Sequence, residues 1–194
     1  MDVHELRPGL WRWTSRHPDW EPDEGLPRDV GSVYYQTPDA VTLVDPLVPE
    51  ADEDRFWRGL DEDVERGGRP VTILLTVPWH ERSAARIAER YGGAIAPEPP
   101  PGIEAIRIQG AGGEPETIFW LPEPGALVVG DIVVGAGAGM VRIAESWLPE
   151  ERRGEPIRAD LRPLLDLHVQ LVLVSHGEPV YERGRAALEH ALRA

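Results

Sequence analysis

Six side chains that could form a chemical site stand near the ends of apolar runs in this 194-residue sequence. They are Trp79, His80, Glu81, Arg82, Asp131 and His176. Imidazole and carboxylate groups bind metal ions and also transfer protons as general acids and bases. A guanidinium group binds carboxylates and phosphates instead. These residue types therefore point to two kinds of chemistry, hydrolysis assisted by a metal ion and recognition of an anionic ligand.

Three predicted strands would position these groups. Residues 71–75, 126–129 and 169–174 are short apolar runs rich in β-branched residues, which is typical of buried strands. The first run is followed by the polar residues 79–82 and then by a predicted helix over residues 83–91. A polar cluster between a buried strand and a helix is a common position for an active site, so residues 79–82 are the first candidates.

The remaining elements predict an α/β (α+β) fold with a single domain over residues 1–194. Further strands are expected at residues 9–14, 32–36, 40–44, 94–96, 105–108 and 117–121. Helices are expected at residues 50–67, 158–167 and 183–193, a surface loop at 17–29 and a flexible glycine-rich loop after Asp131. Strands come in runs early and alternate with helices later, which predicts two mixed β-sheets facing each other with helices on the outside.

The composition excludes several classes of function. The sequence has no cysteine, so disulfides, thiolate nucleophiles and thiolate metal sites are all excluded. Its net charge of −14, with no lysine present, opposes binding to nucleic acid or to an anionic membrane surface. The N-terminal residues lack the pattern of a signal peptide, and no apolar run is long enough to span a bilayer, so we expect a cytoplasmic protein.

Three segments, in this order, resemble the metallo-β-lactamase fold superfamily. They are VTLVDPLVP at residues 41–49, FWLPEPGALVVGDIVVG at 119–135 and LVLVSHGEPV at 171–180. Together with the strand, polar cluster and helix at residues 71–91, they extend the resemblance over roughly residues 5 to 190. The resemblance implies an αββα sandwich and, as is usual in that family, two bound zinc or iron ions.

The metal-binding motif of that family is largely replaced in this sequence. The ligands of the family's His-x-His-x-Asp-His motif correspond to Val77, Trp79, Glu81 and Arg82, and His80 falls on a spacer position. Valine, tryptophan and arginine side chains offer no lone pair to a metal ion. The first metal position has therefore lost every imidazole that the resemblance would assign to it.

The second metal position retains three matched ligands at most. The resemblance assigns them to Glu81, to Asp131 as the bridging carboxylate and to His176 as the last histidine. Another family histidine corresponds to the turn at residues 110–113, which contains no histidine. A catalytic zinc ion generally needs three protein ligands, and Arg82 places a permanent cation beside this position. We therefore expect no binuclear centre and, under the first hypothesis below, no metal cofactor.

The first hypothesis is a diverged, metal-free protein without hydrolase activity. It binds a small anionic ligand or a protein partner in a vestigial cleft formed by the six residues named at the outset. Arg82 then forms an ion pair with Asp131 in place of the metal, because a buried carboxylate without a compensating charge is costly. His80 and Glu81 face solvent at the start of the helix, where the helix dipole favours a carboxylate.

The second hypothesis is a hydrolase with a rearranged mononuclear site. His80 then turns inward and joins Glu81, Asp131 and His176 as a ligand of one zinc, iron or manganese ion. The ion lowers the pKa of a water molecule that attacks an ester, thioester or amide. The direction of the His80 side chain therefore distinguishes the two hypotheses.

The early tryptophans, Trp11, Trp13 and Trp20, leave further interpretations open. With the loop at residues 17–29 they wall a pocket, or they pack in the core or at a sheet edge. An exposed apolar patch around Trp11 and Trp13 would instead favour a third hypothesis, a structural subunit of a homodimer. Closure of the glycine-rich residues 135–139 over a ligand is compatible with the sequence but is not determined by it.

Overall fold

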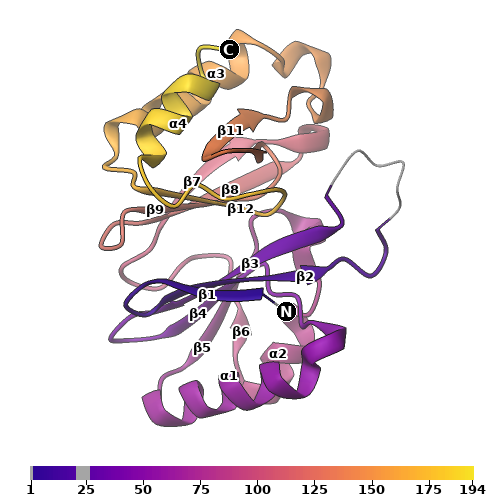
Figure 1. Cartoon of the computed structure of the whole chain (residues 1–194), viewed down its shortest axis with the longest axis vertical. Helices are drawn as coiled ribbons and strands as arrows, with labels where there is room; N and C mark the ends of the chain where they lie inside the picture. Colours follow the sequence, from indigo (N-terminus) through magenta and orange to yellow (C-terminus); the bar gives the residue numbers. More distant parts are fainter. Residues whose placement is uncertain (1, 21–26) are drawn as a thin grey trace. The chain divides into compact units, whose positions relative to one another are not determined.

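The computed structural model describes residues 2–20 and 27–194, and the chain forms two compact units (Figure 1). Unit 1 consists of Met1–Leu75 and Trp79–Gly102, and unit 2 consists of Thr76–Pro78 and Ile103–Ala194. The expected single domain over residues 1–194 stays a prediction. Of the helices in the described ranges, none combines the length and the apolar character that crossing a bilayer requires.

Unit 1 is built on a six-stranded sheet in the order β1-β2-β3-β4-β5-β6. The strands are Asp2–Arg7, Leu10–Arg16, Asp29–Gln36, Val41–Val44, Val71–Leu74 and Ala94–Ile95. The first four pair antiparallel, whereas β4 with β5 and β5 with β6 pair parallel, so the sheet is mixed. Because β4 and β5 are parallel and in register from Val41 and Val71, the residues that follow them leave the sheet at the same edge.

Two helices pack on this sheet, α1 (Glu53–Gly67) and α2 (Ala84–Tyr91). Helix α1 buries Phe56, Trp57 and Leu60, whose helical spacing in the sequence predicted the helix. The helix ends at Gly68, which adopts a left-handed conformation. The guanidinium groups of two α2 arginines lie 5.0 and 4.8 Å from the centre of the Trp57 ring and cover it. Both predicted helices of this region are therefore present, and their apolar residues join one core with the sheet.

Unit 2 contains a four-stranded sheet in the order β12-β9-β8-β7. The strands are β7 (Glu104–Gln109), β8 (Pro115–Leu121), β9 (Ala126–Val129) and β12 (Leu171–Val174). The pair β12 and β9 is parallel, and the other two pairs are antiparallel. All residues of β9 and β12 are buried, as their continuous apolar runs predicted. The predicted fold class, with two mixed sheets and helices, is confirmed.

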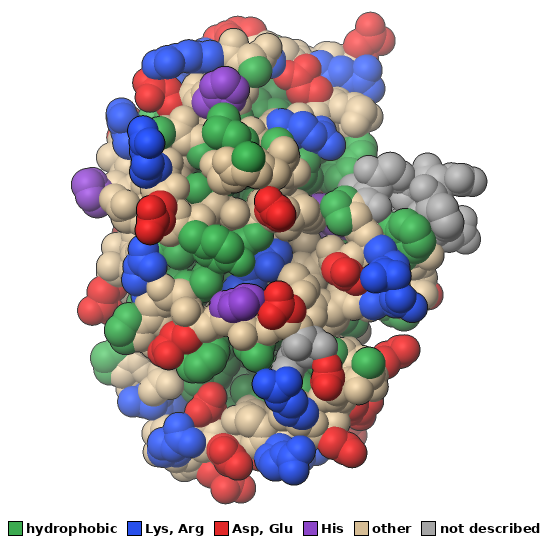
Figure 2. Space-filling view, in the orientation of Figure 1, with side chains coloured by type: hydrophobic (Ala, Val, Ile, Leu, Met, Phe, Trp, Pro, Cys, Tyr) green, Lys and Arg blue, Asp and Glu red, His purple; other side chains and the backbone are tan. Residues whose placement is uncertain are grey.

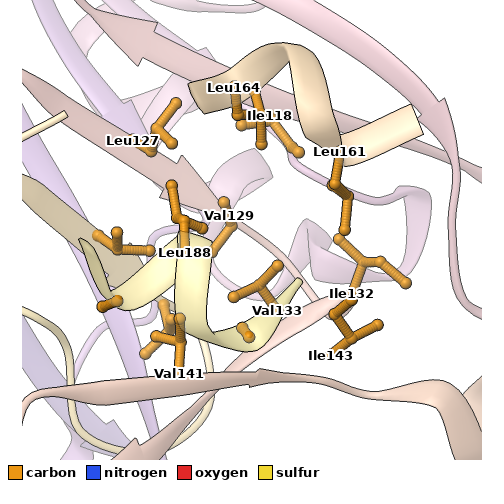
Figure 3. Close-up of a cluster of buried hydrophobic side chains, with 14 of the residues drawn as sticks. Ile118, Leu127, Val129, Ile132, Val133, Val141, Ile143, Leu161, Leu164 and Leu188 are labelled. Carbon is orange, nitrogen blue, oxygen red and sulfur yellow. The ribbon is translucent and has the colours of Figure 1, made fainter. Parts of the chain in front are cut away.

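Helices α3 (Glu155–Leu161) and α4 (Gly184–Ala191) complete unit 2. Figure 3 shows their leucines meeting valine and isoleucine side chains of the strands in one apolar cluster. The helix predicted over residues 158–167 begins earlier, with Pro156 in its first turn, and continues after Leu161 as a 3-10 turn that contains Pro163. A proline early in a helix is favourable, whereas one in the interior removes a hydrogen bond, which explains both shifts.

The glycine-rich segment is ordered, so the prediction of a flexible loop there was wrong. Residues Val133–Gly137 and Met140–Ile143 form the antiparallel hairpin of β10 and β11. Gly135 lies so close to the backbone of Glu178 that a Cβ atom would be 2.2 Å from its carbonyl oxygen. The glycine here permits a close approach of two backbone segments, which hydrophobic periodicity does not reveal.

Two further differences concern the first thirty residues. Strand β1 was not predicted, because its residues alternate between exposed and half-buried and lack a continuous apolar face. Residues 21–26 of the expected loop at 17–29 lie outside the described residues.

On the face drawn in Figure 2, arginine and carboxylate side chains are interspersed, so the basic groups there do not form a stripe.

Candidate functional site

His80 is buried and paired with a carboxylate that sequence reasoning did not select. It lies in the 3-10 turn Pro78–Glu81 after β5, is 4% exposed, and its Nδ1 atom is 2.9 Å from Oδ2 of Asp45. Because an ionised carboxylate only accepts hydrogen bonds, this contact places a ring proton on Nδ1, and in the neutral imidazole the lone pair is then on Nε2. The interpretation of His80 as a solvent-facing residue was wrong.

Asp45 owes its position to the end of strand β4. Its backbone N–H donates to the Leu74 carbonyl at 3.0 Å, and its own carbonyl accepts from the Ser32 hydroxyl at 2.8 Å. The sequence did contain a signal for this contact, because Asp45 directly follows β4 and the turn with His80 follows β5. The parallel pairing of β4 and β5 that brings these two ends together was not predicted.

Arg82 forms hydrogen bonds with the backbone next to the pair of Asp45 and His80. Its Nη1 atom donates to the carbonyl oxygens of Gly31 at 3.0 Å and Asp45 at 2.9 Å. The residue adopts a left-handed conformation, with φ of 38°, which is uncommon outside glycine. The expected ion pair with Asp131 joins residues of different units and stays a prediction.

The side chains of the other two residues of the polar cluster, Trp79 and Glu81, are exposed. Glu81 is exposed, as expected for the start of a helix, and Trp79 is 47% exposed. The alternation of burial through residues 79–82 comes from the tight 3-10 turn, which sends consecutive side chains in different directions. Of the cluster, His80 is thus the residue whose side chain is buried.

Asp131 and His176 meet inside unit 2. They follow β9 and β12, whose last residues Val129 and Val174 are aligned in the parallel pair. The Nε2 atom of His176 lies 3.2 Å from Oδ1 of Asp131, and the two side chains are 9% and 8% exposed. The Trp147 ring covers the imidazole edge-on, with ring centroids 5.8 Å apart. Both residues were candidates from the sequence, and the pairing of their strands brings them together.

A second buried carboxylate, Glu116 on β8, supports the chain at Asp131. It is fully buried and accepts the backbone N–H groups of Gly130 at 3.1 Å and Ile132 at 3.0 Å. Burial, and then the nearby charge of Asp131, raises the pKa of Glu116 to about 8. Sequence reasoning missed it because the predicted strand began one residue later, at Thr117. The available signal was the alternation that places it on the same buried face as Ile118.

One cavity lies in unit 1 and involves none of the six candidate residues. It has a volume of about 520 Å³ and lies beside α1, with Trp11, Trp13, Tyr34 and Phe56 among its lining. Trp11 and Trp13 line this pocket, and Trp13 also belongs to the core cluster against which Trp11 packs, so both interpretations apply to them. Trp20 is not among the lining residues. Trp13 is only 3% exposed, so the exposed patch that would favour a homodimer lacks one of its two residues.

Comparisons with known proteins identify the fold. No protein-family model and no curated protein matches the sequence. Among solved structures, the DIM-1 metallo-β-lactamase exposed to ceftazidime is similar with a TM-score of 0.67 and 13% identity, covering 99% of this chain and 94% of that one. A metallo-β-lactamase from Erythrobacter litoralis gives 0.60 and 14% over 98% and 90% of the two chains.

A metallo-β-lactamase family protein from Thermus thermophilus has a TM-score of 0.53 and 18% identity, covering 97% of this chain and 80% of that one. Identities at this level show a common fold and do not transfer an activity. The resemblance drawn from the three sequence segments extends over nearly the same residues. The chain therefore has the metallo-β-lactamase fold.

Proposed function

We propose that this protein is a hydrolase that uses a single divalent metal ion, with His80, Asp131 and His176 as its protein ligands. The proposal keeps three members of the mononuclear set and omits Glu81, which is exposed. Each of the three remaining residues is buried and offers a nitrogen or oxygen atom of the kind that zinc, iron and manganese accept. Three protein ligands with one open position are the usual requirement of a catalytic zinc site.

The observation that carries the proposal is the contact of His80 with Asp45. Histidines that bind metal ions almost always donate their second ring N–H to a carboxylate or a carbonyl, which fixes the tautomer and the ring direction. In His80 this donor is Nδ1, at 2.9 Å from Asp45, so Nε2 is the ligating atom. A histidine that merely fills the core needs no buried carboxylate behind it, and burying that charge is costly.

The pair in unit 2 fits the same chemistry. Two ligand atoms at zinc–ligand distances in a tetrahedral site lie about 3.4 Å from each other. The separation of 3.2 Å between His176 Nε2 and Asp131 Oδ1 is close to this value. The resemblance independently assigns these two residues to ligand positions of the second metal. Their spacing and their burial both support a role as ligands.

The chemistry follows from the residue types. A bound divalent ion would lower the pKa of a water molecule and polarise a substrate carbonyl, which suits hydrolysis of an ester, thioester or amide. Asp45 holds His80 in one tautomer, and Trp147 shields the ring of His176 from one side. Buried ligands with fixed directions reduce the reorganisation that accompanies binding. Cytoplasmic location and the absence of nucleic-acid or membrane partners stay predictions.

The metal-free binding hypothesis has weaker support. It relied on Arg82 to attract an anionic ligand or to replace the metal beside Asp131. In unit 1 the Nη1 atom of Arg82 donates to two backbone carbonyls, which gives this side chain a structural task. It also relied on a solvent-facing His80, and that side chain is buried.

The experiment that tests the proposal is metal content. Protein purified without chelator and without an affinity-tag metal is analysed by inductively coupled plasma mass spectrometry, before and after dialysis against Zn²⁺. We expect close to one metal ion per chain, lost in His80→Ala, Asp131→Ala and His176→Ala. His168→Ala is the matched control, because His168 is exposed. The loaded protein is then assayed with ester, thioester and amide substrates.

Two results would overturn the proposal. One is wild-type protein that stays well below one ion per chain after dialysis against Zn²⁺. The other is metal content that survives all three ligand substitutions, which would place the ion elsewhere on this acidic chain. Stoichiometric metal without hydrolysis of any substrate class would retain the metal site and reject the hydrolase activity.

A further inference from the structure

The three residues after strand β9 direct their backbone N–H groups at a single carboxylate. Oε1 of Glu116 accepts from Gly130 at 3.1 Å, and its two oxygens accept from Ile132 at 3.3 and 3.0 Å. The backbone of Asp131, between them, is also hydrogen-bonded to this carboxylate. The acceptor sits on β8 and the donors lie beyond the end of β9, so the contact ties two adjacent strands at one edge of the sheet.

A carboxylate is the side chain best suited to this position. Consecutive N–H groups that converge in the interior form an anion-binding concavity and are costly to bury without acceptors. A carboxylate offers two oxygens with about four lone-pair directions. A glutamine of the same shape would put an NH₂ group opposite one of the N–H donors. The two oxygens of Glu116 are therefore matched to the N–H groups of this loop.

Glycine backbones confine the Glu116 side chain from two directions. A Cβ atom at Gly110 would lie 2.7 Å from the Cβ of Glu116, and one at Gly130 would lie 3.2 Å from its Oε1. The same atom at Gly130 would also be 2.6 Å from the Thr76 hydroxyl. The loop at residues 130–132 and the Glu116 side chain are thus closely packed, and a shift of either would displace the other.

We propose that Glu116 is a positioning residue, which fixes the direction in which Asp131 presents its carboxylate to the metal ion and to His176. This inference rests on the proposed function, in which Asp131 is a ligand. The amides on both sides of Asp131 are held by the same carboxylate, so the Cα–Cβ bond of Asp131 has a defined direction. In this proposal Glu116 is not itself a ligand, because its two oxygens accept the loop amides.

The test compares Glu116→Gln with Glu114→Gln in the full chain. Both substitutions remove one carboxylate from the same segment, but Glu114 is exposed and accepts none of the loop amides. The affinity for Zn²⁺ is measured by competition with a chromophoric chelator, and the stability of the metal-free proteins by urea denaturation. We expect Glu116→Gln to weaken Zn²⁺ binding about ten- to a hundredfold, the usual effect of losing a group behind a ligand. Glu114→Gln should bind like the wild type.

A second substitution approaches the same contact from the loop. Gly130→Ala retains Glu116 but introduces a Cβ atom that must displace the Thr76 hydroxyl or the carboxylate. We expect it to weaken Zn²⁺ binding in the same direction while the protein remains folded. If Glu116→Gln does not fold, this variant decides the proposal. Wild-type affinity in every folded variant of Glu116 or Gly130 would show that Glu116 only stabilises the fold, and would overturn the proposal.

A separate measurement distinguishes failure of this inference from failure of the proposed function. Hydrogen exchange of the Gly130, Asp131 and Ile132 amides is recorded by nuclear magnetic resonance without metal. If the wild type binds no Zn²⁺, the proposed function fails and exchange alone decides the role of Glu116. Faster exchange at these amides in Glu116→Gln, with the rest of β9 protected, would support the role of Glu116 in positioning Asp131. Unchanged exchange would refute it.

Discussion

Oδ2 of Asp45 and Nδ1 of His80 lie 2.9 Å apart in unit 1, and both side chains are no more than 5% exposed. A buried carboxylate that accepts from a histidine holds the ring in one tautomer and one direction. The arrangement connects the end of β4 with the turn after β5 and explains why an acid follows the apolar strand β4. Asp45 can therefore be substituted to test the proposed metal site without removing any of its proposed ligands.

Substitution of Asp45 should weaken metal binding without removing a ligand. Asp45→Asn keeps the size of the side chain, but its amide can donate to Nδ1 and so favour the other tautomer of His80. We expect the dissociation constant for Zn²⁺ to rise about ten- to a hundredfold. Chelator competition measures it, and Asp39→Asn is the control because Asp39 is exposed at the turn before β4. Equal affinities of the two variants would show that Asp45 has no influence on the metal.

Two glycine substitutions should shift stability in opposite directions. Gly135→Ala places a Cβ atom 2.2 Å from the Glu178 carbonyl oxygen, so the hairpin must move, and we expect a loss of about 2–3 kcal/mol. Gly59→Ala lies within α1 and meets nothing within 4 Å, so it should stabilise by about 0.5–1 kcal/mol. Urea denaturation of both variants measures the free energies of unfolding. A neutral Gly135→Ala would contradict the close backbone packing.

The stability of unit 1 should fall at alkaline pH because of Tyr34. Its hydroxyl donates to Oε1 of Gln36 at 3.2 Å, and burial raises the pKa of Tyr34 from 10.0 to about 12. Between these pH values the folded protein keeps a proton that the unfolded chain has released. The contribution is therefore complete below pH 10 and is lost as the pH rises towards 12, by about 2–3 kcal/mol in total.

Comparison with Tyr34→Phe isolates this effect, because phenylalanine keeps the ring and cannot ionise. The free energy of unfolding of both proteins is measured by urea denaturation below pH 10 and again near pH 12. We expect the wild type to lose more stability than Tyr34→Phe over this interval. A constant difference between the two proteins would mean that Tyr34 ionises at its ordinary pKa in the folded state.

The sequence by itself determined the elements that end at the candidate site. Continuous apolar runs predict β9 and β12, and the residues that follow them, Asp131 and His176, are the acid and the histidine that the parallel pair brings to 3.2 Å. Apolar residues at helical spacing predict α1 and α2 in the same way. These features are local, because burial of one face of a strand or helix sets the residue pattern directly.

Tertiary structure alone decided how the polar residues between those elements are used. The burial of His80 depends on the direction of one side chain in a 3-10 turn and on Asp45, which is 35 residues away in the chain. Glu116 depends on loop amides 14 and 16 residues further on, and the glycine-rich hairpin depends on the backbone of Glu178. Such contacts between distant residues leave no periodic pattern, because a single hydrogen bond or close approach constrains one position and none of its neighbours.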